Sequence, residues 1–209
     1  MTWTEIAGFV TGALCVWLVV KRNIWNLPVG IANYIFFFVL FIGSGLYADA
    51  GLQVVYFGLA LYGWYSWLRG GEDHSALKVH NPTMPQFLAC LAAVGAIWAA
   101  IQFGLHRYTD STVAGWDAIT TALSLVAQFM LSRKWIANWW LWIAADLIYI
   151  PLYAFKGLWL TAGLYGIFLA MCIVGLMEWR AARAKMLAAE NPPPDQSVSP
   201  ARIAARPSR

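Results

Sequence analysis

Charged side chains are scarce in this chain. Aspartate, glutamate, lysine and arginine together make up 11% of its 209 residues, whereas 61% of the residues are hydrophobic. Soluble domains usually carry about 25% charged residues, so this composition excludes an ordinary soluble globule and indicates a protein that contacts the lipid bilayer. The net charge of +4 does not indicate nucleic-acid binding, because the basic residues lie between apolar segments or near the C-terminus.

Cysteine and histidine are also rare, with three residues of each. The cysteines lie in separate apolar segments without the paired spacing of a disulfide or metal framework, and we interpret them as small core residues. No histidine lies near a cysteine, serine or acid at a spacing typical of catalysis, so we expect solvated loop residues. We therefore expect no enzyme, no cofactor and no metal site. These residues are Cys15, Cys90, Cys172, His74, His80 and His106.

Long apolar segments dominate the rest of the chain. A membrane-spanning helix needs about 20 mostly apolar residues, and charged or turn residues divide the chain into seven such segments. Their approximate ranges are 3–20, 24–43, 47–68, 84–105, 112–132, 135–155 and 157–178. They are too long for barrel strands and lack an alternating pattern. We predict an all-α integral membrane protein with seven transmembrane helices, and a disordered, proline-rich tail at 186–209.

Lysine and arginine are distributed unevenly between the two sides of this predicted bundle. The side opposite the C-terminus holds only Arg107 and Lys156. By the positive-inside rule, we predict that the N-terminus lies outside the cell and the C-terminus in the cytoplasm. The predicted cytoplasmic residues are Lys21, Arg22, Arg69, Lys78, Arg133, Lys134, Arg180, Arg183, Lys185, Arg202, Arg206 and Arg209.

An internal repeat appears when the chain is shifted by 112 residues. Lys21-Arg22 then falls on Arg133-Lys134, and "AGLQVVYF" at 50–57 falls on "AGLYGIFL" at 162–169. We predict two parallel three-helix bundles, 3–68 and 112–178, joined by a linker transmembrane helix at 84–105. Transporters built from such repeats bind substrate between them, near mid-membrane. A transporter is the leading hypothesis, while a membrane sensor without transport and an intramembrane enzyme are the alternatives.

The sixth segment carries one stripe of aromatic and acidic residues, namely Trp139, Trp142, Asp146, Tyr149 and Tyr153, because their spacing places them on one helix face. An aspartate facing lipid at the helix centre would cost about 2.5–3.5 kcal/mol, so this face should point into the protein. We predict a substrate site there. The alternative is a core aspartate that is hydrogen-bonded among packing aromatics.

Polar residues on other segments extend this predicted site. Asp117, Thr121, Ser124 and Gln128 form a second stripe, although Thr121 and Ser124 are equally compatible with helix–helix hydrogen bonds. Aromatic faces attract planar rings and cations, and amides suit hydroxyls, which together favour a flat cationic ring bearing a polyol. The predicted substrate-binding residues are Trp25, Asn33, Gln53, Tyr56, Thr121, Gln128, Asn138, Trp139, Trp142, Asp146 and Tyr149.

Four blocks, "NIWNLPVGIANYIFFFVLF", "SGLYADAGLQVVYFGLALYGWYSWLRGG", "DAITTALSLVAQF" and "NWWLWIAADLIYIPLYAFKGLWLTA", resemble the PnuC family of bacterial nicotinamide riboside transporters. The resemblance covers about residues 3–180. The family signature of Trp, two residues, Trp, three residues, then Asn or Asp is met by Trp139, Trp142 and Asp146, but Leu27 stands where a second tryptophan is expected, which predicts a looser wall in the first half.

This resemblance implies a SWEET-like arrangement of three, one and three helices in the bacterial inner membrane. It implies facilitated diffusion of nicotinamide riboside by alternating access, with the substrate trapped by phosphorylation and hence a functional link to a cytoplasmic riboside kinase. Relatives are also thought to carry thiamine, riboflavin or deoxynucleosides, and thiamine is the main rival because its thiazolium ring is cationic too. The oligomeric state, a homo-oligomer included, is left open.

Overall fold

The computed structural model describes residues 3–43, 45, 47–108, 114–155 and 157–190. This part of the chain contains seven α-helices and one short 3-10 helix, η1 (Glu72–His74). The α-helices are α1 (Trp3–Val20), α2 (Asn26–Gly43), α3 (Tyr47–Arg69), α4 (Met84–Tyr108), α5 (Ala114–Ser132), α6 (Asn138–Phe155) and α7 (Trp159–Glu190). The prediction of an all-α chain with seven long helices is confirmed.

The last helix differs most from the sequence prediction. Helix α7 continues to Glu190, past the expected start of the tail near residue 186, and residues 191–209 lie outside the described part. The segment "RAARAKMLAAE" consists of strong helix formers, above all alanine. Lys78 also forms an ion pair with Glu190, at 2.8 Å between Nζ and Oε1. Helix propensity and this ion pair thus account for the extension.

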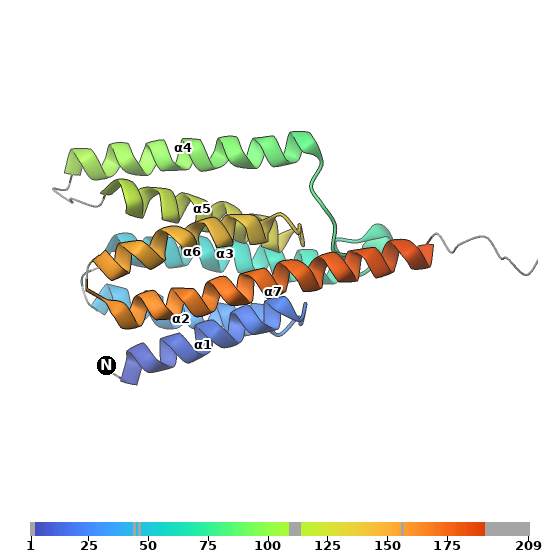
Figure 1. Cartoon of the computed structure of the whole chain (residues 1–209), viewed down its shortest axis with the longest axis horizontal. Coiled ribbons are helices and arrows are strands. Elements are labelled where there is room, and N and C mark those ends of the chain that lie inside the picture. Colours follow the sequence, from blue (N-terminus) through green and yellow to red (C-terminus); the bar gives the residue numbers. More distant parts are fainter. Residues whose placement is uncertain (1–2, 44, 46, 109–113, 156, 191–209) are drawn as a thin grey trace, which may run out of the picture.

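Six helices form a closed ring around the centre of the bundle. Each half contributes three consecutive helices in contact, α1 to α3 and α5 to α7. The ring closes where α1 packs against α7 and α3 packs against α5. Helix α4 packs mainly on α5 and lies outside the ring (Figure 1). The centre is therefore bordered by both halves and not by α4.

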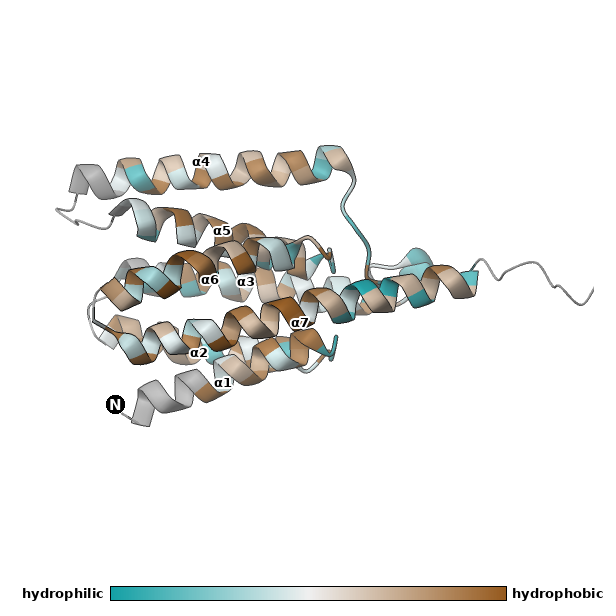
Figure 2. Cartoon of the chain, in the orientation of Figure 1, coloured by the Kyte–Doolittle hydropathy of each residue, from teal (hydrophilic) through white to brown (hydrophobic). Residues whose placement is uncertain are grey.

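Hydrophobic residues are frequent along the helices (Figure 2), and many large ones are exposed on the outer surface. Within the described residues, three stretches are long and apolar enough to cross a membrane: Asn26–Gly43, Met84–Gly104 and Trp159–Glu190. Large hydrophobic side chains such as Leu88 and Phe103 are exposed on α4. Apolar patches of this kind are rare on soluble monomers and typical of surfaces that contact lipid.

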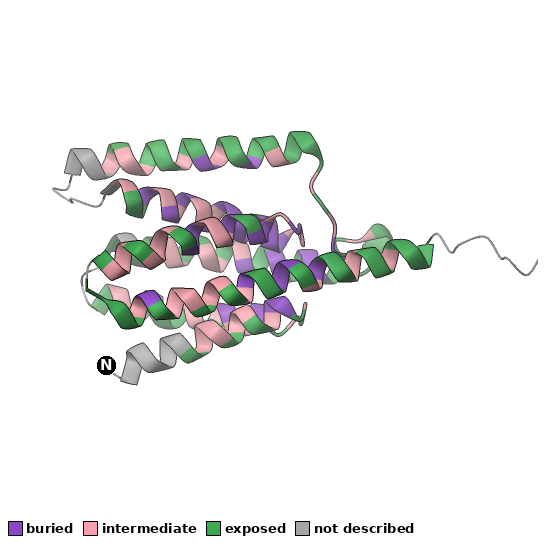
Figure 3. Cartoon of the chain, viewed as in Figure 1, coloured by how far each residue is buried: buried purple, intermediate pink, exposed green. Residues whose placement is uncertain are grey.

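Buried residues gather toward one end of the bundle (Figure 3). The loops 21–25, 70–83 and 133–137 lie at this end, on the right in Figure 1, and we call it the basic end. Val20, Trp67 and Trp179 are buried in one hydrophobic cluster there. His80 is half-buried and accepts a hydrogen bond from Trp135, at 2.9 Å between Nε2 and Nε1, so the expectation of a solvated loop residue was wrong for this histidine. His106 lies within α4, not in a loop.

The two halves make matching interactions 112 residues apart. Trp67 Nε1 donates to the carbonyl of Leu131 at 3.1 Å, and Trp179 Nε1 donates to the carbonyl of Val19 at 3.0 Å. Each bond joins the third helix of one half to the first helix of the other. Two pairs of backbone φ angles match as well, 55° at Arg22 with 51° at Lys134, and 74° at both Gly45 and Gly157.

Candidate substrate-binding site

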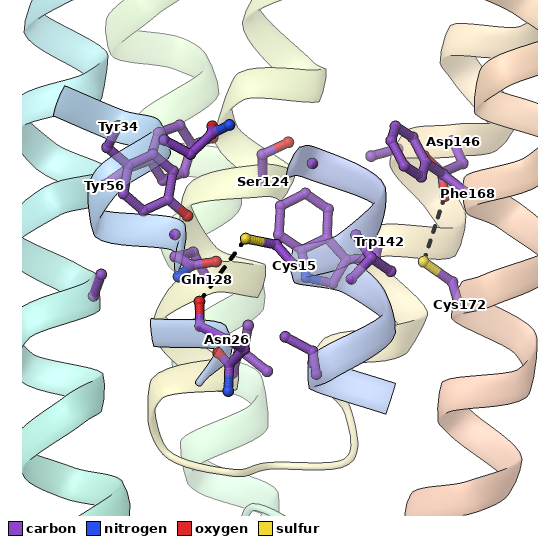
Figure 4. A pocket seen from close by; sticks show the side chains of 18 of the residues that line it. Cys15, Asn26, Tyr34, Tyr56, Ser124, Gln128, Trp142, Asp146, Phe168 and Cys172 are labelled. Atoms are coloured by element: carbon purple, nitrogen blue, oxygen red, sulfur yellow. Dashed lines mark hydrogen bonds between the residues drawn. The ribbon is translucent and has the colours of Figure 1, made fainter. Parts of the chain in front are cut away.

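A central cavity of about 460 Å³ lies inside the ring of six helices. Residues from α1, α2, α3, α5, α6 and α7 line it, and most of their side chains are apolar or aromatic (Figure 4). Pockets of this size, with a few polar groups among aromatics, are typical of small-molecule sites. The predicted residues that line it are Asn33, Gln53, Tyr56, Gln128, Trp139, Trp142, Asp146 and Tyr149, together with Ser124 from the second stripe.

Asp146 carries the one carboxyl group among the described residues that line the cavity. It lies on α6 with 5% of its surface exposed. Its Oδ2 atom accepts a hydrogen bond from the thiol of Cys172 on α7, at 3.5 Å. Since no lysine or arginine is among these lining residues, the cavity suits a neutral or cationic ligand and would repel an anion.

Aromatic rings form two opposing walls of the cavity. Tyr34 stacks on Tyr56, with ring centroids 5.6 Å apart and an interplanar angle of 18°. On the other side, Tyr165 lies 4.5 Å from Tyr149, measured between centroids. Trp142 is half-buried and lies between Tyr56 and Asp146 in the close view (Figure 4). Flat surfaces of this kind can receive a planar ring by stacking.

Trp139 lines the cavity from a packed position at its edge. The side chain is almost fully buried, and its ring lies edge-on to Trp179, with centroids 5.5 Å apart. The six-membered part of the indole approaches the backbone of Gly175 so closely that a Cβ atom there would clash with it. The Nε1–H group of Trp139 is buried without a hydrogen-bond partner among the described residues.

Further polar groups, from α1, α2 and α5, complete the lining. Asn33 Nδ2 on α2 donates a hydrogen bond to Thr11 Oγ1 on α1 at 2.7 Å, and this bond orients the Asn33 amide. Cys15 Sγ lies 3.9 Å from the carbonyl of Asn26, at the start of α2. Gln128 is buried on α5. These groups supply donors and acceptors for hydroxyls or an amide.

Three predicted site residues lie outside the cavity. Trp25 precedes α2 and is 65% exposed. Asn138 is fully buried, but its Nδ2 atom donates to the Trp135 carbonyl at 2.6 Å, so it holds the loop before α6. Thr121 is half-buried on α5. Because α5 packs against α3, α4 and α6, its helical stripe alone could not indicate which side faces the cavity.

Two residues of the predicted stripes also lie outside. Tyr153 does not line the cavity, but its ring stacks on Tyr165 at 5.2 Å and 11°. Asp117 is exposed in the first turn of α5. The stripe on α6 therefore continues beyond the cavity to Tyr153, whose ring packs with those of Tyr149 and Tyr165.

Sequence reasoning missed several aromatic and thiol residues that line the cavity, among them Tyr34, Tyr165, Phe168, Cys15 and Cys172. An aromatic side chain in an apolar segment is usually a packing residue, and the cysteines were interpreted as core residues for the same reason. The 112-residue repeat could have identified three of these residues, because it aligns them with residues that were predicted or found to line the cavity. It aligns Tyr34 with Asp146, Tyr165 with Gln53 and Phe168 with Tyr56.

Comparison with known proteins matches this chain to one transporter family. The sequence model of the nicotinamide mononucleotide transporter family matches residues 2–181. The nicotinamide riboside transporter PnuC of Escherichia coli strain K12 is 26% identical over 204 residues, which cover 86% of this chain and 85% of the relative. The riboflavin/roseoflavin transporter RibM of Streptomyces davaonensis is 28% identical over 180 residues, covering 85% and 84% of the two chains.

One solved structure is similar over most of the chain. The crystal structure of the vitamin B3 transporter PnuC superposes with a TM-score of 0.67 at 25% sequence identity. The match covers 88% of this chain and 83% of the other. The helical arrangement around the central cavity thus has a counterpart in a solved structure.

Proposed function

This chain belongs to the nicotinamide mononucleotide transporter family, and on that premise we propose that it carries nicotinamide riboside across the bacterial inner membrane. A transporter family and a set of long apolar helices together indicate a multi-pass membrane protein rather than an enzyme. The single observation that carries the choice of substrate is the lining of the central cavity, where one carboxyl group lies between aromatic walls.

The chemistry of nicotinamide riboside fits this lining. Its pyridinium ring is flat and cationic, so Trp142 and the tyrosines can stack on it and Asp146 can neutralise it. Gln53, Gln128 and Asn33 offer partners for the carboxamide and the ribose. A mononucleotide would add a phosphate of about −1.5 to −2 charges, which the described lining does not neutralise. The riboside is therefore the better substrate.

The matched interactions of the two halves support a transport mechanism by alternating access. We propose that α1–α3 and α5–α7 are parallel repeats related by an axis along the membrane normal, with α4 as the linker. The reciprocal bonds of Trp67 and Trp179 and the matching φ angles support this assignment. The buried cluster around these tryptophans adjoins the cavity, since Leu27, Leu131 and Trp139 belong to both, and we propose that it closes the cavity at the basic end. Rocking of the halves would open that end and close the other.

The same scheme predicts the orientation of the protein in the membrane and the driving force for transport. The basic end faces the cytoplasm by the positive-inside rule. No ATP-binding motif accompanies the helices in the described part, and a carrier of this kind moves its substrate down the concentration gradient. Phosphorylation by a cytoplasmic riboside kinase would then keep the riboside inside, because the central cavity disfavours an anion.

The proposed function is tested by titrating the purified protein separately with nicotinamide riboside, thiamine and riboflavin, followed by tryptophan fluorescence and by uptake into proteoliposomes. Selective, saturable quenching with uptake of the riboside is expected. A response to thiamine alone would move the substrate to the rival cation, and one to riboflavin alone would place this chain with RibM. Saturable binding without flux would favour a sensor.

The site is tested separately with Trp142→Ala combined with Asp146→Ala. Losing a stacking surface and a charge partner should weaken binding about tenfold or more, since each contributes about 0.5–2 kcal/mol. Tyr65→Ala is the matched control, because Tyr65 is exposed on α3 and does not line the cavity. Unchanged uptake kinetics in a well-expressed double variant would refute the site assignment.

A further inference from the structure

A second pocket, of about 500 Å³, lies at the basic end of the molecule. It is bordered by the start of α4, the start of α6 and the C-terminal part of α7 (residues 178–190), and it shares no lining residue with the central cavity. We call it the side pocket. Trp140, Arg180 and Arg183 line it, together with Met84, Phe87 and Leu187. Nothing in the transport scheme above uses these residues.

The side pocket is electropositive. No acidic residue is among the described residues that line it, and the two acids in the C-terminal part of α7 are already paired, Glu178 with Lys21 at 3.1 Å and Glu190 with Lys78 at 2.8 Å. The Arg180 guanidinium lies 5.4 Å from the centroid of the Trp140 ring. Helices α4 and α6 begin at this pocket, and the positive ends of their dipoles favour an anion. The ligand should therefore carry negative charge.

The side pocket is also partly apolar, and it continues onto the lipid-facing side of α4. Met84 is 69% exposed and Trp140 is 49% exposed. Leu88 and Leu91 extend the exposed apolar surface along α4. An exposed tryptophan beside arginines at the end of a membrane helix is typical of the membrane–water interface. A free inorganic anion would leave this apolar surface unused.

We propose that the side pocket binds the phosphodiester head group of an anionic phospholipid, with Arg180 and Arg183 on the phosphate and the acyl chains along α4. Guanidinium groups are well suited to phosphate oxygens, and basic pockets between membrane helices recognise such head groups. Since α4 packs mainly on α5, the bound lipid would connect the linker helix to α6 and α7. This inference goes beyond substrate transport and does not depend on the identity of the substrate.

The test uses the full chain in neutral detergent and counts bound lipids by native mass spectrometry during titration with phosphatidylglycerol or phosphatidylcholine. Preferential binding of phosphatidylglycerol is expected. In Arg180→Gln with Arg183→Gln, its affinity should fall about 30-fold, because each basic residue near the surface contributes about 1 kcal/mol. Lys185→Gln is the matched control, because Lys185 is exposed on the same helix outside the pocket, and it should bind like the unmodified chain.

Equal loss in Lys185→Gln, equal binding of phosphatidylcholine, or undiminished binding by the double variant would overturn the proposal. Inorganic phosphate that competes with phosphatidylglycerol at millimolar concentration would show a site for a free anion instead.

A second measurement tests the same proposal without replacing the arginines. In nanodiscs, brominated phosphatidylglycerol should quench tryptophan fluorescence more than brominated phosphatidylcholine does. Trp140→Phe should abolish this difference, and a persistent difference would contradict the proposal.

Discussion

At the scale of single residues, Trp139, which lines the central cavity, packs closely against Gly175. Gly175→Ala would place a methyl group against the indole ring, and overpacking of this kind costs about 1–3 kcal/mol. We expect a lower thermal unfolding midpoint in detergent and weaker riboside binding, because Trp139 must shift. Gly163→Ala on the same helix is the control, since a Cβ atom there meets nothing within 4 Å. Equal midpoints for the two variants would contradict this packing.

The polar lining of the cavity could be predicted from the sequence, but its aromatic lining could not. A carboxyl or amide group in an apolar segment is costly in lipid, and this cost alone predicts that Asp146, Gln128 and Gln53 point inward. Tyr34 and Phe168 carry no such cost, so their hydrophobicity is compatible with any face. Asn138 also has a buried polar side chain, but its hydrogen bond stabilises the loop before α6. A polar residue in an apolar segment predicts a buried hydrogen-bond partner, but it does not show whether that partner is a ligand or the backbone.

At the scale of helices, the two reciprocal tryptophan bonds join the third helix of each half to the first helix of the other. Trp67→Phe and Trp179→Phe should each lower stability by about 0.5–1.5 kcal/mol through loss of one hydrogen bond. Because the two rings are in contact, 6.1 Å apart between centroids, the double variant should deviate from additivity. Trp64→Phe on α3, an exposed tryptophan, should change little. A large loss in only one of the reciprocal variants would argue against equivalent roles.

Lys134, in the loop between α5 and α6, makes the basic end sensitive to pH. Burial, and to a lesser degree the charge of Arg22, lowers its pKa to about 8, and the unfolded value is about 10.4. Between these values the unfolded chain holds a proton that the folded chain has released, so stability should increase as pH rises from about 8 to about 10. The unfolding midpoint should therefore rise relative to that of Lys134→Met across this window. Parallel pH curves for the two proteins would contradict the prediction.

The positions of the helices could be predicted from hydrophobicity, but the starts of α2 and α6 and the end of α7 could not. Charged and turn residues divide the apolar segments, which located the seven helices within a few residues except for the end of α7. The starts of α2 and α6 are displaced inward because Asn26 and Asn138 each bond to a loop carbonyl three residues earlier. The end of α7 was predicted too early, because a polar helix stabilised by alanine and an ion pair has no hydrophobic signal.

At the scale of the whole molecule, the proposed alternating access makes a prediction that uses two native thiols. Cys15 and Cys172 line the central cavity, while Cys90 lies on the linker helix α4 and packs against α5 outside the cavity. In Cys90→Ala protein oriented in proteoliposomes, a membrane-impermeant maleimide should reach the cavity from the side opposite the basic end, and nicotinamide riboside should slow labelling. Cys15→Ser with Cys172→Ser added to this background should abolish labelling, which assigns the signal to the cavity.

The same labelling distinguishes a carrier from a channel, because a carrier exposes its site to one side at a time. If Trp67 and Trp179 hold the basic end closed, replacing both with phenylalanine should increase labelling from that end and decrease it from the other. A channel would instead be labelled from both ends before any replacement, and the tryptophan variants would raise both rates. The decrease at the far end is the decisive result, since local loosening of the basic end alone cannot produce it.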